Sequence, residues 1–154
     1  MRKVFDWNRE MKLWIDRIFL VALVAIITVL TVTALPVLAG GHVAGPMLLL
    51  HMAASGALVF VLPLFALFYL GRCISRFKSD GLQRLGYWSL LVTGLLTIVT
   101  VFICMLPLPS TETMHELVAI HRYAGFAMVP AVVVLVIGAS RWRRIQSTRS
   151  ATPG

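Results

Sequence analysis

The sequence has few charges and little cysteine. Only 13% of its 154 residues are charged, whereas 59% are hydrophobic, and this composition excludes an ordinary soluble domain. The two cysteines, Cys73 and Cys104, are far apart and show no CxxC or CxxCH spacing. Neither a covalent c-type haem nor a zinc knuckle is therefore supported. What is present is a set of long apolar segments, separated by short segments that contain most of the basic residues.

Four apolar segments are long enough to cross a membrane. Each can span a bilayer core of about 30 Å as a helix that rises about 1.5 Å per residue. The first is longer than the core of a signal peptide, so we expect it to be retained. The pattern predicts an all-α fold, an integral membrane four-helix bundle that forms a single domain over residues 1–144, followed by a disordered tail over 145–154. The predicted spans cover residues 18–39, 46–70, 85–106 and 114–140.

The basic residues indicate the orientation of these spans. Of the 14 lysines and arginines, all but Arg122 lie in the N-terminal head, the second loop or the C-terminal tail. The positive-inside rule places these three segments, and both termini, in the cytoplasm. The net charge of +8 is thus a topology signal rather than a sign of nucleic-acid binding. An apolar residue recurs every three or four positions ahead of the first span, which predicts an amphipathic interfacial helix. These apolar residues are Val4, Trp7, Met11, Trp14 and Ile18.

The histidines all fall on the opposite, outer side of the predicted membrane. They are His42, His51, His115 and His121. His51 lies 20 residues before Gly71, and His121 lies 20 residues before Arg141, so their imidazoles are expected at one depth in antiparallel spans. Ionisable groups within membrane spans are costly and usually functional. Binding of a b-type haem, whose iron takes two axial imidazoles, would explain such a pair.

The residues around these histidines agree with one outer-side haem b. Arg122 lies within the outer half of a span, where it needs an anionic partner, and haem propionates would supply one. Ser55, Gly56 and Gly125 are small enough for a flat macrocycle to approach the backbone, although small residues also serve helix packing. His42, in a glycine-rich loop, is expected beside the site, facing solvent or a partner, rather than on the iron.

The second iron ligand remains open between His115 and His121. Thr113 and Glu116 fit a capping box, which would place His115 in the first turn of the last helix. Because six residues separate the two histidines, their side chains point about 120° apart on a straight helix and cannot both face one iron. His51 is therefore expected to pair with only one of them.

Three short motifs resemble the bacterial cytochrome b561 superfamily, which includes the cytochrome b subunits of hydrogenases. They are VFDW before the first span, LLHMAASG in the second and MHELVA at the start of the fourth. The resemblance implies that His51 and His115 ligate the outer haem. It also implies a second, inner haem, but the first span has no histidine and Val129 stands where the other inner ligand would be. The inner haem is therefore expected to be absent.

The resemblance implies a membrane b-type cytochrome in the bacterial inner (cytoplasmic) membrane. It would carry electrons on the periplasmic side, between quinol and a periplasmic partner or as the membrane subunit of an oxidoreductase complex, rather than act as a stand-alone enzyme. Two alternatives remain. One is a copper site, for which thioether and thiol ligands are present, and the other is a cofactor-free scaffold subunit. The soft ligands on the outer side are Met47, Met52, Met105, Met114 and Cys104, but they form no compact MxxM motif.

Overall fold

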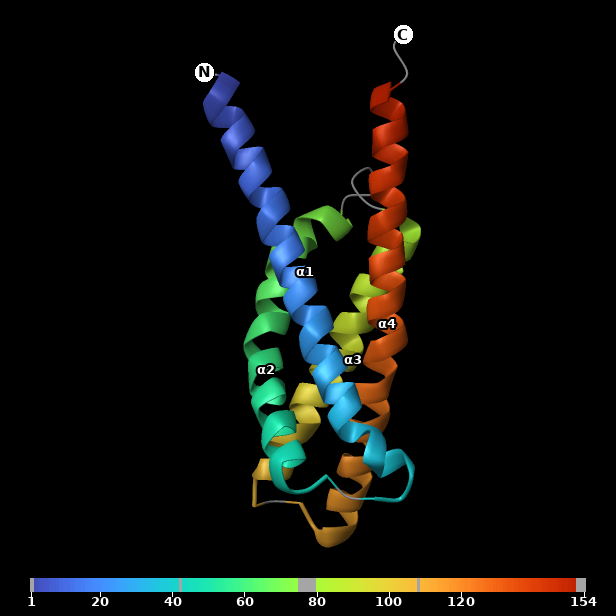
Figure 1. Ribbon diagram of the computed structural model, residues 1–154. Coiled ribbons are helices and arrows are strands. Elements are labelled where there is room, and N and C mark those ends of the chain that lie inside the picture. The colour runs from blue at the N-terminus through green and yellow to red at the C-terminus, as the bar shows by residue number, and fades with distance from the viewer. Residues whose placement is uncertain (1, 42, 75–79, 108, 152–154) are drawn as a thin grey trace. The chain divides into compact units, whose positions relative to one another are not determined.

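The chain folds into four long α-helices (Figure 1). The computed structural model describes residues 2–41, 43–74, 80–107 and 109–151, and side chains for 14–15, 17–41, 43–70, 80–107 and 109–144. Within these ranges there is no strand, and each helix is long and apolar enough to cross a bilayer. The predictions of an all-α fold and of a multi-pass membrane protein are confirmed. The helices are α1 (Arg2–Leu38), α2 (Gly45–Ile74), α3 (Gly81–Met105) and α4 (Thr111–Ala151).

The helices belong to two compact units, Met1–Tyr69 and Leu70–Gly154. In the first unit, α1 and α2 form an antiparallel hairpin (Figure 1). A Schellman turn ends α1, because the Gly41 N–H donates to the Pro36 carbonyl at 2.9 Å and the Gly40 N–H donates to the Val37 carbonyl at 3.2 Å. Gly40 has a φ of 78°, a conformation that glycine adopts without steric cost.

In the second unit, α3 and α4 form an antiparallel hairpin with a very close helix crossing. A Cβ atom added at Gly138 would lie 2.6 Å from the Gln83 Cα, and one added at Gly86 would lie 2.6 Å from the Leu135 Cα. Neither position can hold a side chain without moving backbone. Small residues allow this approach, which increases van der Waals packing where lipid provides no hydrophobic driving force between helices.

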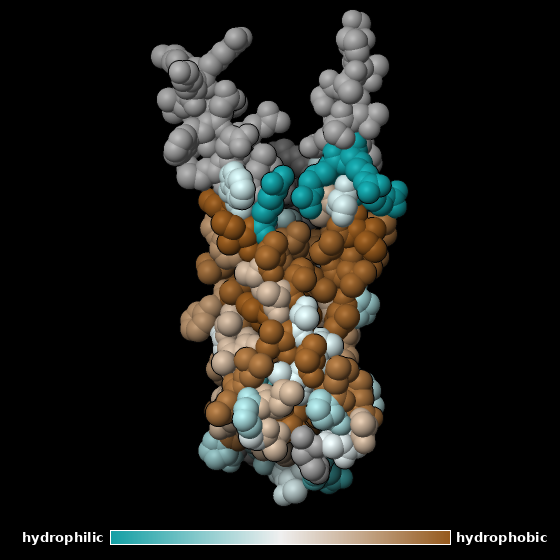
Figure 2. Space-filling view, in the orientation of Figure 1, coloured by the Kyte–Doolittle hydropathy of each residue, from teal (hydrophilic) through white to brown (hydrophobic). Residues whose placement is uncertain are grey.

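Large apolar side chains cover the exposed faces of the helices. Phe60, Leu67 and Leu49 are 73%, 70% and 70% exposed, and hydrophobic residues dominate the visible surface along the helices (Figure 2). Such a surface would be unstable in water, since soluble proteins rarely expose large contiguous apolar patches. It is instead what a bilayer environment requires.

The helix boundaries differ from the expected ones at three places. The N-terminal head is not a separate interfacial helix, because α1 runs without a break from Arg2. The side chains of Val4, Trp7 and Met11 lie outside the described residues, so the amphipathic face is described only at Trp14 and Ile18, which are exposed. At the other end, the backbone of α4 continues to Ala151, through most of the tail that was expected to be disordered. The segment between Arg144 and Ala151 has no proline or glycine to stop the helix.

The start of α4 also differs from the predicted capping box. Ser110 is the N-cap: its Oγ accepts from the Thr113 N–H at 3.3 Å, and its carbonyl accepts from the Met114 N–H at 2.9 Å. A serine side chain satisfies such an unpaired donor of the first turn well. The N-cap of α4 is therefore three residues earlier than the predicted N-cap, Thr113. As a result, His115 lies in the second turn of the helix rather than the first.

Candidate histidine site

His51 is held within the first hairpin by a threonine of α1. Its Nδ1 lies 2.8 Å from Thr33 Oγ1, and the same hydroxyl donates to the Val29 carbonyl at 2.8 Å. A hydroxyl has only one proton. If the Thr33 hydroxyl donated it to Nδ1, Thr33 Oγ1 and the Val29 carbonyl oxygen would lie 2.8 Å apart with no proton between them. The Nδ1–H of His51 therefore donates to Thr33 Oγ1. Thr33 is almost fully buried, and His51 is half-buried.

His121 is held in the same way within the second hairpin. Its Nδ1 lies 3.1 Å from the Thr97 carbonyl and 3.3 Å from Thr100 Oγ1. A carbonyl only accepts, so Nδ1 must carry the proton. The Thr100 hydroxyl donates to the Leu96 carbonyl at 2.9 Å, which leaves its oxygen as a second acceptor. His121 is half-buried, like His51.

The two hairpins repeat one arrangement. Thr33 lies five residues before Leu38, the end of α1, and Thr100 lies five residues before Met105, the end of α3. Each histidine also begins the buried stripe of its own helix, since the residues 3, 7 and 14 positions later are buried in both cases. These residues are Ala54, Leu58 and Phe65 after His51, and Ala124, Met128 and Leu135 after His121. Both imidazoles thus lie on the inward face of a helix, near the loop that joins it to its neighbour.

This hydrogen bonding determines what the imidazoles can do chemically. In a neutral ring with the proton on Nδ1, the lone pair is on Nε2. Histidines that bind metals commonly donate their second ring N–H to a carbonyl or another acceptor, which fixes the tautomer and the ring orientation. The three threonines were not predicted from the sequence. The available signal was weak, because Thr33, Thr97 and Thr100 are three of several hydroxyl residues within these spans.

His115 has a different environment. Its side chain is exposed, near the start of α4 and six residues before His121. That separation turns it away from the buried stripe that His121 begins. The structure thus separates the two candidates that the sequence left open, one lying on the inward face and the other on the surface.

Arg122 contacts its neighbour Tyr123. Its Nη2 donates to the Tyr123 hydroxyl at 3.4 Å, and its Cζ lies 5.1 Å from the centroid of the Tyr123 ring. Arg122 as a whole residue is half-buried, but this hydrogen bond is exposed, and neither of these contacts supplies the anion expected for the guanidinium. Tyr123 is exposed, so the cation and the ring together lie at the surface of α4. His42 lies outside the described residues.

The predicted small residues take different positions. Ser55 and Gly125 each lie four residues after a histidine, on the same face of their helix, and are half-buried. A Cβ added at Gly125 would meet no atom within 4 Å. Gly56 is exposed and turned about 140° from His51 at about 100° per residue. Ser55 and Gly125, but not Gly56, therefore share a face with the histidines.

The soft ligands proposed for copper come from both units, Met47 and Met52 from the first and Cys104, Met105 and Met114 from the second. Cys104 is a half-buried free thiol. In the part of the chain that the structure describes, no three His, Cys, Asp or Glu side chains come close enough to hold a metal ion. A haem needs only two axial protein ligands, so a pair of histidines suffices for it.

Comparison with protein-family models, with curated proteins and with solved structures finds no match in any of the three. The function is therefore inferred from the residues of this chain.

Proposed function

We propose that the chain is a membrane cytochrome that binds one b-type haem through His51 and His121. The shared hydrogen bonding of the two histidines carries this proposal. Each donates its Nδ1–H to an acceptor on the preceding helix, and each begins a buried stripe. Two neutral imidazoles that carry the proton on Nδ1 and would bind iron through Nε2 are a suitable axial pair for a haem.

The position of the pair along the helices supports the same function. Both histidines lie 20 residues from the predicted cytoplasmic ends of their spans, at Gly71 and Arg141, so we expect them at matching depths in the membrane, as one iron between them would require. Gly125 leaves room on the face of α4 that His121 shares, because an added Cβ there would meet no atom within 4 Å. When bound, the haem supplies one-electron redox chemistry. The protein orients the imidazoles and excludes water with its apolar stripes.

The basic ends of the helices set the direction in which the cytochrome works. With the basic head, second loop and tail in the cytoplasm, the histidines lie near the outer face of a bacterial inner membrane. A single haem there transfers electrons on the outer side, between quinol and a periplasmic partner or within a redox complex. The resemblance to cytochrome b561 proteins, with the inner histidines missing, supports this role.

The test is a reduced-minus-oxidised absorption spectrum of the purified chain together with a pyridine haemochrome count. We expect one haem b per chain. A colourless protein with stoichiometric copper would replace the haem proposal with the copper site, and a protein with neither group would support a scaffold role.

Replacing Thr33 with valine is expected to raise the midpoint potential of the haem. The substitution removes the acceptor for His51 Nδ1–H, so the imidazole becomes a weaker donor and ferric iron is less stabilised. Loss of a hydrogen bond worth about 0.5–1 kcal/mol corresponds to about 20–40 mV for one electron. The measurement is a redox titration. The control is Thr28→Val, because Thr28 bonds the Val24 carbonyl of its own helix; an equal shift in both variants would contradict the role of Thr33.

Replacing Arg122 with leucine is expected to lower the midpoint potential and loosen haem binding. The change removes a positive charge on the helix of His121, one residue beyond the proposed ligand, and ferric iron is favoured when a nearby cation is lost. The shift should be on the order of tens of millivolts. Arg143→Leu removes the same charge near the other end of α4 and should leave the potential unchanged. An unaltered potential in Arg122→Leu would show that Arg122 has no part in the site.

A further inference from the structure

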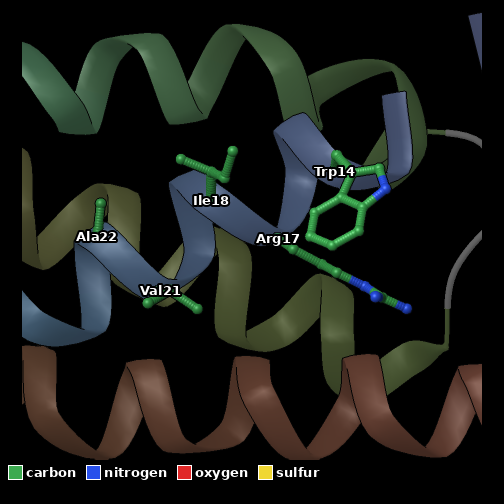
Figure 3. Close-up of a pocket in the computed structure, with 5 residues that line it drawn as sticks. All are labelled: Trp14, Arg17, Ile18, Val21 and Ala22. Atoms are coloured by element: carbon green, nitrogen blue, oxygen red, sulfur yellow. The ribbon is translucent and has the colours of Figure 1, made fainter. Parts of the chain in front are cut away.

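One face of α1 combines a cation, an aromatic ring and a shallow apolar groove. The groove is lined by Trp14, Arg17, Ile18, Val21 and Ala22, which follow one another at helical spacing (Figure 3). The Cζ of Arg17 lies 5.9 Å from the centroid of the Trp14 ring. Trp14, Ile18 and Val21 are each at least 60% exposed, so the groove is open along its length.

The groove begins at the membrane boundary. The apolar span of α1 covers Arg17–Leu38, so the guanidinium lies where the span starts, at headgroup depth. Trp14 precedes it, at the level where tryptophan is enriched in membrane proteins. Ala22 is five residues further, about 7.5 Å deeper at about 1.5 Å per residue. The polar end of the groove therefore faces the headgroup region and its apolar end faces the acyl chains.

A ligand that fits this groove must be negatively charged at one end and apolar at the other. We propose that the groove binds one anionic phospholipid. Arg17 pairs with the anionic headgroup, because guanidinium groups recognise phosphate through charge-assisted hydrogen bonds. Trp14 packs beside the glycerol region, and one acyl chain follows Ile18, Val21 and Ala22. The proposal does not depend on haem binding.

The test measures lipid selectivity on the purified full chain. Phosphatidylglycerol and phosphatidylcholine with identical acyl chains are titrated separately, and bound lipid is counted by native mass spectrometry. We expect phosphatidylglycerol to bind about fivefold more tightly, the preference that one interfacial arginine confers. Arg17→Gln should bind the two lipids equally, whereas Arg17→Lys should keep part of the preference.

Two controls separate this site from general attraction of a basic protein for anionic lipid. Arg143→Gln makes the same change in net charge at an exposed residue of α4 and should retain the full preference. Ala22→Trp fills the apolar end of the groove and should weaken binding of both lipids. Equal loss of preference in Arg17→Gln and Arg143→Gln would overturn the proposal, as would an unchanged preference in Arg17→Gln. Displacement of phosphatidylglycerol by free glycerol phosphate would also overturn it, since the site would then be a simple anion site. Helical content by circular dichroism verifies that each variant is folded.

Discussion

His51→Ala and His121→Ala are each expected to abolish haem binding, whereas His115→Ala should retain one haem per chain. Loss of hydrogen-bond partners around a metal ligand already costs about 10–100-fold in affinity, so loss of the ligand itself should reduce bound haem to below about a tenth of the wild-type amount. The measurement is the haemochrome count on chains purified in parallel. The three variants make the same chemical change on two helices.

His115 serves as the matched control because it shares α4 with His121 but is exposed. Haem loss in His115→Ala with retention in His121→Ala would reverse the ligand assignment in favour of the pairing that the family resemblance implies. Full haem in His51→Ala would overturn the site. Because an alanine variant can lose haem by failing to fold, added free imidazole provides a second measurement. Recovery of the haem spectrum in the His51→Gly variant with imidazole would show that the pocket is intact.

Gly138→Leu is expected to disrupt the second hairpin. Even a Cβ at this position would lie 2.6 Å from the Gln83 Cα, so a leucine forces α3 and α4 apart. Overpacking of this kind costs about 1–3 kcal/mol or more, which corresponds to a fall in Tm of about 2–12 °C for a chain of this size. Thermal unfolding in detergent, followed by circular dichroism, measures the change. The separation also moves Thr97 and Thr100 away from His121, so haem content should fall as well.

Gly81→Leu is the control for this substitution. Gly81 begins α3, and a Cβ at that position would meet no atom within 4 Å. Its Tm should change by less than half as much as that of Gly138→Leu. A similar loss of stability in both variants would contradict the close crossing at Gly138, since the effect would then come from leucine replacing glycine in any helix.

The spans could be predicted from the sequence because a bilayer imposes a simple length and polarity requirement on each helix. That His51 and His121 face inward could not be predicted, because the side of a helix that is buried depends on where the neighbouring helix packs. Apolar residues occur all round these helices, so no amphipathic stripe indicates the buried side. The sequence therefore did not indicate that His121 is half-buried and His115 exposed.

Two further features depended on contacts between helices. Gly86 lies against Leu135, and Gly138 lies against Gln83, only because α3 and α4 are antiparallel with one particular register. The same register brings Thr97 and Thr100 to His121. The N-cap of α4 was misassigned for a local reason: Ser110 and Thr113 are both suitable caps, and the choice between them depends on where the preceding loop turns.

The threonine partner of each histidine lies on the helix immediately before it in the chain. Thr33 and His51 are 18 residues apart, and Thr100 and His121 are 21 residues apart. Each half of the site is therefore complete as soon as one pair of helices has entered the membrane, without a contact from the other pair. During synthesis, the first imidazole can be oriented while the second hairpin is still being made. In the proposed cytochrome, maturation then requires only that two preorganised halves meet, so we expect cofactor insertion to follow membrane insertion rather than guide it.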